Sequence, residues 1–207
     1  MLTAPIEPDL PERPAAPPRA RLHLHAPDDA RRDEVESFIR QVYARRFDAR
    51  PAVLAPWLVT VQDGGRILAA AGYRVAVEPL FLERYLDRPI EAMLATRAGE
   101  VPDRSRIVEV GHLAAVRAGE GRRLILLLAA HLARRRMEWV TGTLTRELRH
   151  LLVRMGVTPL ALCAADPARL GEAAGDWGRY YAHRPLVLAG RLPPVLRRLA
   201  RRPEAAR

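Results

Sequence analysis

Ile107-Val108-Glu109-Val110-Gly111-His112-Leu113-Ala114 is the stretch that decides the fold, because it places a glutamate and a glycine inside an otherwise apolar β-run. The run extends over residues 106–116, and strand alternation puts Glu109 and Gly111 on one face and His112 on the other. A glycine inside a strand indicates a β-bulge, and a bulge at Gly111 would turn His112 toward the face of Glu109. The stretch therefore predicts a central strand that is irregular at its middle.

Glu109 is the first candidate for chemistry in this strand. A carboxylate among apolar residues costs free energy unless it is paired or protonated. Desolvation would raise the pKa of Glu109 toward that of a general base able to take a proton from an attacking amine. The alternative is a structural ion pair with a buried arginine, for which Arg74 is the candidate. His112 would assist proton transfer or orient a substrate, or else be a core histidine satisfied by the backbone.

The pattern on either side of this strand predicts the remaining elements. The expected helices cover residues 28–47, a segment 79–98 that is broken at Pro89, a segment that follows Gly119 and Gly121, and residues 145–155. The expected strands cover residues 21–25, 57–62, 66–77, 138–143, 158–164 and 186–189. The order predicts an α/β fold of the α+β type, with a mixed central sheet flanked by helices. We expect a proline-rich extension at 1–19, one domain at 20–192 and a basic tail at 193–207.

Composition narrows the class of function. Of 207 residues 49% are hydrophobic, which is enough for a core, and the formal net charge of +10 predicts an anionic partner. All 34 basic residues are arginine, which excludes Schiff-base lysine and phosphate-loop lysine chemistry. Aromatic residues are scarce, at 5%, and are not interleaved with the arginines, so we expect no nucleic-acid partner.

Other chemistry is disfavoured as well. The single Cys163 forms no internal disulfide and suits a reducing cytoplasm, where we expect the protein. His23 and His25 lack a third ligand motif, so no metal is expected. The longest apolar run, residues 124–133, is far shorter than the about 20 residues of a membrane span.

Four longer strings carry a family resemblance. They are Gly72-Tyr73-Arg74, residues 80–91, residues 107–114 and Trp177-Gly178-Arg179-Tyr180-Tyr181. In that order they resemble the thermostable hemolysin family, which is similar in fold to GNAT acyltransferases and more distantly to acyl-homoserine-lactone synthases. The family name records lysis of red cells and states no molecular mechanism.

The resemblance implies where a thioester donor would bind. In GNAT proteins the backbone N–H groups between the long strand and the next helix hold the pyrophosphate of acyl-CoA, and a bulge splays two strands to admit the pantetheine arm. The matching residues here are Leu113, Ala114, Ala115, Arg117, Gly119, Gly121, Arg122 and Arg123. The GNAT pattern is Arg/Gln-x-x-Gly-x-Gly/Ala, but in this chain Val116 stands at the position of the Arg or Gln. An ordinary glycine turn with solvated arginines therefore remains the alternative. The donor would be acyl-CoA or an acyl carrier protein, with no tightly bound cofactor.

The candidate binding site for the acyl acceptor is made of acidic and aromatic residues. A lid of residues 80–91 over the splayed strands would hold an amine, and aromatic residues near 180 would cap an acyl tunnel. The candidate substrate-binding residues are Arg74, Phe81, Glu83, Tyr85, Glu91, Trp177 and Tyr181. The alternatives are a solvated acidic helix face and ordinary core aromatics.

Together these features favour a cytoplasmic acyltransferase that moves an acyl group from a thioester to a small amine. The alternative is a directly membrane-active hemolysin-type protein without transferase activity. A peripheral membrane contact through the basic tail and a homodimer are further options.

Overall fold

The computed structural model describes residues 21–193, without the side chains of residues 97, 98 and 118. Its strands are β1 Arg21–His25, β2 Trp57–Asp63, β3 Arg66–Val75, β4 Ile107–Ala115, β5 Trp139–Leu144, β6 Leu160–Ala164 and β7 Leu186–Arg191. Its α-helices are α1 Arg32–Phe47, α2 Ile90–Ala98, α3 Ala118–Arg134 and α4 Arg146–Arg154. Short 3₁₀ helices are η1 Phe81–Tyr85, η2 Arg104–Arg106, η3 Pro167–Trp177 and η4 Tyr180–His183.

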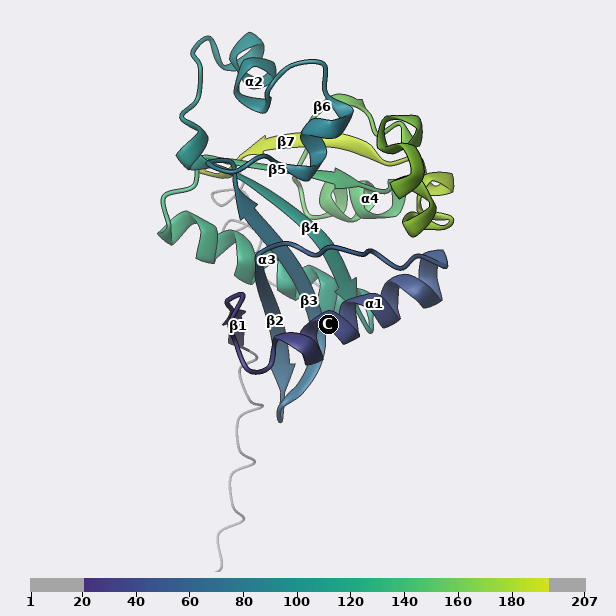
Figure 1. The fold of residues 1–207 in the computed structure, drawn as a ribbon. Helices are drawn as coiled ribbons and strands as arrows, with labels where there is room; N and C mark the ends of the chain where they lie inside the picture. The colour runs from purple at the N-terminus through teal and green to yellow at the C-terminus, as the bar shows by residue number, and fades with distance from the viewer. Residues whose placement is uncertain (1–20, 194–207) are drawn as a thin grey trace, which may run out of the picture.

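The strands form one mixed sheet with the order β1-β2-β3-β4-β5-β7-β6 (Figure 1). Only β4 and β5 pair in parallel, because α3 connects them as a crossover; the remaining neighbours are antiparallel. This arrangement confirms the predicted fold class.

Helices cover both faces of the sheet. The apolar side of α3, with Leu124 and Leu128, packs on Val59, Val61 and Val108. On the opposite face, α1 buries a stripe at helical spacing against β2, β3 and β4; the stripe comprises Val35, Ile39, Tyr43 and Phe47. A third cluster lies beneath η1 and α2 at the β5–β7 end of the sheet. The central strands are therefore buried on both faces.

The sheet opens between β4 and β5. The two strands pair only from Ile107 to Glu109 and then diverge, as Figure 1 shows. The β3–β4 register shifts between Ala70 and Gly72, and His112 in the shifted stretch has a φ of 54°. The predicted bulge and splay near Gly111 are thus confirmed, but the left-handed residue is His112 and not the glycine.

On β5, Gly142 marks the point at which β4 and β5 begin to diverge. A Cβ atom on Gly142 would lie 2.5 Å from the carbonyl oxygen of Val110, so only glycine lets β5 approach β4 this closely. Immediately beyond this contact the strands part.

Some predicted boundaries differ from the structure. Helix α1 begins at Arg32 rather than residue 28, because Asp29 accepts a hydrogen bond from the Arg31 N–H and closes a turn first. Gly119 and Gly121 lie in the first turn of α3 instead of before it. The break at Pro89 separates η1 from α2 as expected. The predicted extension and nearly all of the basic tail lie outside the described residues.

Within residues 21–193, no helix combines the length and the apolar composition needed to cross a bilayer.

Candidate functional site

Two clefts meet where β4 and β5 part. The first, the Glu109 cleft, has a volume of about 480 Å³ and lies between the β4 bulge, η1 and the residues around Trp177. The second, the α3 cleft, has a volume of about 370 Å³ and extends from the same gap to the start of α3. Both are lined by Tyr43, Gly111, His112, Thr143 and Tyr180. The two clefts therefore adjoin at the opening in the sheet.

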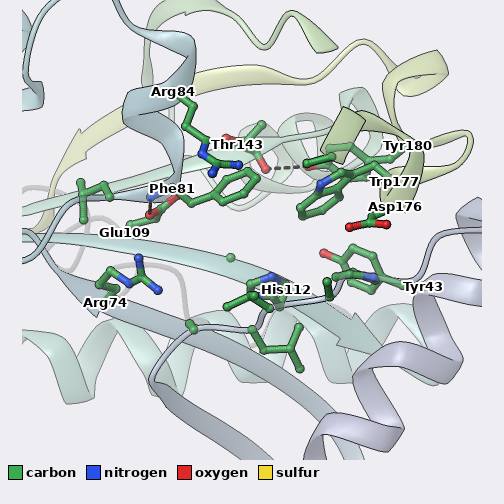
Figure 2. Close-up of a pocket in the computed structure, with 18 of the residues that line it drawn as sticks. Tyr43, Arg74, Phe81, Arg84, Glu109, His112, Thr143, Asp176, Trp177 and Tyr180 are labelled. Atoms are coloured by element: carbon green, nitrogen blue, oxygen red, sulfur yellow. Dashed lines mark hydrogen bonds between the residues drawn. The ribbon is translucent and has the colours of Figure 1, made fainter. Parts of the chain in front are cut away.

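Glu109 faces the first cleft with both carboxylate oxygens bonded to η1 (Figure 2). Its Oε2 accepts the Phe81 N–H at 2.7 Å, and its Oε1 accepts the Leu82 N–H at 3.0 Å. Burial, with 9% of the residue exposed, raises the pKa of Glu109 to about 7; the two N–H groups and the nearby Arg74 oppose this shift. Such a carboxyl group changes protonation near neutral pH.

The ion pair between Glu109 and Arg74, which was the structural alternative for Glu109, does not form in the described part of the chain. The two residues are register partners on β4 and β3, but the Arg74 Nη1 donates to the Pro79 carbonyl at 3.0 Å. Arg74 thus lines the cleft beside Glu109 without neutralising it directly. Backbone N–H groups take the place of the arginine as partners of the carboxylate.

Glu83 and Glu91, which were predicted to bind the acceptor, lie outside the Glu109 cleft. Glu83 accepts the N–H groups of Leu80 and Ile90, and both glutamates pair with Arg104. Burial raises the pKa of Glu83, but the hydrogen bonds from Arg104 and the backbone outweigh it, and the net shift is downward. Neither glutamate lines the Glu109 cleft; they hold η1, whose N–H groups in turn bind Glu109.

His112 lies in the bulge and lines both clefts. Its ring stacks on Trp177, with centroids 6.2 Å apart and planes at 19°. Burial, with smaller contributions from Arg74 and Arg40, lowers the pKa of His112 to about 4, so the ring is neutral at neutral pH. The bulge brings His112 to the same cleft as Glu109, as the parity argument predicted.

Two buried polar atoms at the meeting point have no protein partner among the described residues. These are the Nδ1 of His112 and the Oγ1 of Thr143. Unsatisfied polar groups are costly in a protein interior and accumulate where a ligand or water completes them. They therefore point to the gap as a place where another molecule binds.

An aromatic wall closes the gap on one side. The Tyr180 hydroxyl donates to the Thr143 carbonyl at 2.8 Å, and Trp177 lies against Tyr43 and Phe81. The predicted residues Tyr85 and Tyr181 share a hydrogen bond of 2.6 Å behind this wall and line neither cleft.

Residues of the Glu109 cleft that the sequence prediction missed include Tyr43, Arg84, Asp176 and Tyr180. Tyr180 stood inside a recognised string, and Tyr43 lay on the apolar stripe of α1. Nothing in the local pattern placed these two residues next to each other.

The α3 cleft contains most of the predicted donor residues. Leu113, Ala114, Ala115, Arg117 and Gly121 line it, whereas Gly119, Arg122 and Arg123 do not. Arg46 of α1 and Arg154 of α4 join the lining from outside the predicted set. Glu120 does not line the cleft; its carboxylate lies 3.6 Å from Arg123.

The backbone of β4 also faces this cleft. The Val116 N–H donates to Leu68 on β3. Because successive N–H groups of a strand point to opposite sides, the Ala115 N–H points away from β3, toward the gap left by β5.

An apolar pocket of about 120 Å³ lies beside the α3 cleft. Helices α3 and α4 and strands β5 and β7 surround it, and we call it the leucine pocket. Leu113, Ile125 and Leu148 line both this pocket and the α3 cleft, so the two spaces are adjacent.

A mixed sheet that opens beside a bulged fourth strand is characteristic of the GNAT-like fold. The chain belongs to the thermostable hemolysin family, whose model matches residues 25–196. No curated protein sequence is significantly similar to the chain.

Solved structures of low sequence identity share this fold. The acyl-homoserine-lactone synthase LasI is 12% identical with a TM-score of 0.55, over 84% of this chain and 91% of that one. FeeM, an N-acyl amino acid synthase from uncultured soil microbes, is 12% identical with a TM-score of 0.56, over 84% and 93%. BjaI, a CoA-dependent acyl-homoserine-lactone synthase solved with SAM and isopentyl-CoA, is 15% identical with a TM-score of 0.56, over 87% of both chains.

Proposed function

We propose that this protein is an acyltransferase that moves an acyl group from a thioester to an amine. The observation that carries the proposal is a buried carboxyl group, Glu109, whose pKa is raised to about 7 beside an opening in the sheet. A base of this pKa is suited to taking a proton from an amine near neutral pH.

The α3 cleft suits the thioester donor. The N-terminal turn of α3 presents backbone N–H groups, and Arg46 and Arg117 add positive charge beside it. A phosphopantetheine arm would run from this end into the gap between β4 and β5. The adjoining leucine pocket would take the acyl chain, since its lining is almost entirely apolar. BjaI, solved with isopentyl-CoA, supports a thioester in a fold of this kind.

The Glu109 cleft suits the acceptor amine. In the proposed reaction the amine nitrogen attacks the thioester carbonyl carbon, and the Glu109 carboxylate receives the proton that the nitrogen loses. The new C–N bond forms as the C–S bond breaks, and the thiolate leaves with the electron pair and is then protonated. The Ala115 N–H, which points to the gap, would polarise the carbonyl oxygen.

A purely structural role for Glu109 is the main competitor to this mechanism. The two hydrogen bonds to η1 would suffice to explain a carboxylate at this position. Hydrogen bonds alone do not require the adjoining clefts, however, nor the unpartnered atoms of His112 and Thr143.

The test is acyl transfer by the purified full chain from acyl-CoA and acyl carrier protein thioesters of several chain lengths to a panel of amines. Mass spectrometry would detect the amide, and the Glu109→Gln variant should lose it. Glu172→Gln, at an exposed glutamate of η3, is the matched control. Absence of both transfer and thioester binding with the wild-type chain would refute the proposal.

A further inference from the structure

Two arginines, Arg74 and Arg84, line the Glu109 cleft together with the carboxylate. Arg74 comes from β3 and lies directly across the strand pair from Glu109. Arg84 comes from η1, and Figure 2 shows the two guanidinium groups above and below Glu109 in that view. Any acceptor whose amine reaches Glu109 therefore lies close to two positive charges.

Phe81 fixes how near Arg84 is to the base. The Phe81 backbone N–H binds Glu109 at 2.7 Å, while the guanidinium carbon of Arg84 lies 5.3 Å from the centre of the Phe81 ring. One residue thus holds both the carboxylate and the arginine.

Neither arginine is paired with an acidic side chain within the described residues. Arg74 donates only to the Pro79 carbonyl, and the contact of Arg84 is with the Phe81 ring. By contrast, the nearby Arg104 pairs with both Glu83 and Glu91. An arginine next to a binding cleft without an acidic partner is well placed to receive a carboxylate from a ligand.

The other residues that line the Glu109 cleft limit which further chemical groups the acceptor can have. The wall beyond Glu109 is apolar and aromatic, with Leu80, Phe81 and Trp177. Asp176 lies on the far side of the cleft, near Trp177 and Tyr43 in Figure 2. A second anionic group at that end would meet the Asp176 carboxylate, which disfavours it.

We propose that the acceptor is an amino acid whose side chain carries no negative charge, held by its carboxylate at Arg84 and Arg74 with its amine directed at Glu109. This inference rests on the acyl transfer proposed above and specifies its substrate. The bond changes are those already given, and the product is an N-acyl amino acid with a free carboxylate.

Three acceptors that differ only at the carboxylate test the inference. L-phenylalanine, L-phenylalaninamide and 2-phenylethylamine are offered to the full chain with an acyl-CoA series and acyl carrier protein thioesters. We expect kcat/KM for phenylalanine to exceed that for the amide and the amine by roughly 10-fold, as for loss of a charged hydrogen-bond partner. Direct binding by calorimetry, which needs no donor, should show the same order.

Variants of the two arginines test whether they cause the preference for the free carboxylate. Arg84→Gln and Arg74→Gln should bring the ratio of phenylalanine to phenylalaninamide activity toward one. Arg66→Gln, at the exposed start of β3 and away from both clefts, should keep the wild-type ratio. A general loss of folding would lower both activities together and leave their ratio unchanged.

The outcomes separate the two proposals. Equal use of the acid, the amide and the amine would overturn the amino acid inference and leave acyl transfer standing. A ratio unaffected by Arg84→Gln and Arg74→Gln, in variants that unfold in urea at the same concentration as the wild type, would also overturn it. If no acceptor is acylated from any thioester, the proposed function fails and this inference fails with it.

Discussion

Glu109 combines a structural position with the protonation behaviour of a base. If it takes the proton from the amine, its carboxylate form is required, so kcat/KM of the wild-type protein should rise as the pH increases through about 7. Glu109→Gln should lower kcat/KM by about 100-fold or more. The measurement is a pH–rate profile from about pH 5 to about pH 9 with saturating thioester.

The same profile distinguishes Glu109 from its neighbour in the bulge. The pKa of His112 is lowered to about 4, so a reaction that used His112 as base would be insensitive to pH around neutrality. A flat pH–rate profile, together with full activity of Glu109→Gln, would exclude Glu109 as the base and limit its role to the hydrogen bonds with η1.

Glu109 should also make folding stability depend on pH, whether or not it is catalytic. Its pKa is about 7 in the folded protein, above the reference value of 4.5, so the folded state binds the proton more tightly than the unfolded state. The resulting stabilisation is full below about pH 4.5 and disappears as the pH rises through 7. Between these limits the wild type should lose up to about 3 kcal/mol relative to Glu109→Gln.

Urea unfolding of both proteins at several pH values would measure this difference. The prediction concerns only how the difference between the two proteins changes with pH, because the altered hydrogen bonds to Phe81 and Leu82 add an amount that does not depend on pH. A difference that stays the same from acidic to neutral pH would show that the carboxyl group titrates normally.

Among the elements, the aromatic turn between η3 and η4 depends on one glycine. Gly178 has a φ of 48°, and a Cβ atom there would lie 2.2 Å from the Asp48 carbonyl oxygen. Gly178→Ala should therefore lower the free energy of unfolding by about 2–4 kcal/mol and displace Trp177 and Tyr180 from the clefts. Gly175→Ala, where nothing lies within 4 Å of the added Cβ, is the control and should be nearly neutral.

Urea denaturation, together with Trp fluorescence as a probe of the wall, would test this. Equal stability of Gly178→Ala and Gly175→Ala would mean that the close approach of the turn to the end of α1 is not needed. That approach includes the hydrogen bonds from the Arg179 N–H to Phe47 and from the Arg50 N–H to Asp176.

The sequence predicted those features of the elements that depend on local signals. Alternation and glycine patterns placed the hairpin and the irregularity in β4, and Pro89 placed the break between η1 and α2. The hydrogen-bond partners of Glu109, the N–H groups of Phe81 and Leu82, were not foreseen, because they are set by tertiary contacts. Arg104 and Glu83 fold η1 back over β4, and no periodicity in the chain records that contact.

The same limit applies to the clefts. The cleft residues that β4 supplies, within residues 109–115, could be predicted from the sequence, because they follow one another along a single strand. Tyr43 and Arg46 enter from α1 and Thr143 from β5, and only the folded sheet brings them to the gap. The recognised strings contained the predicted lining residues Arg74, Phe81 and Trp177, but membership of a string did not suffice, since Arg84 and Tyr180 in the same strings were missed.

Over the entire chain, the net charge of +10 should favour an anionic donor. If Arg46 and Arg117 hold the phosphates of acyl-CoA, replacing either with glutamine should raise KM for acyl-CoA by about 5-fold. The effect should diminish as salt rises from low to physiological concentration, because added ions screen exposed charges. Steady-state kinetics at several salt concentrations, with Arg66→Gln as control, would test this, and unchanged KM values would place the phosphates elsewhere.

Membrane lysis, which the family name records, would follow from acyl transfer if the product is responsible. An N-acyl product joins an apolar chain to a polar head and partitions into bilayers according to its chain length. Dye leakage from lipid vesicles should then need the protein, a thioester and an acceptor together, and Glu109→Gln should abolish it. A directly membrane-active protein would instead release dye without any thioester and would retain this activity in Glu109→Gln. Vesicle leakage with each component omitted in turn separates these two mechanisms, and release by the protein alone would exclude the product as its cause.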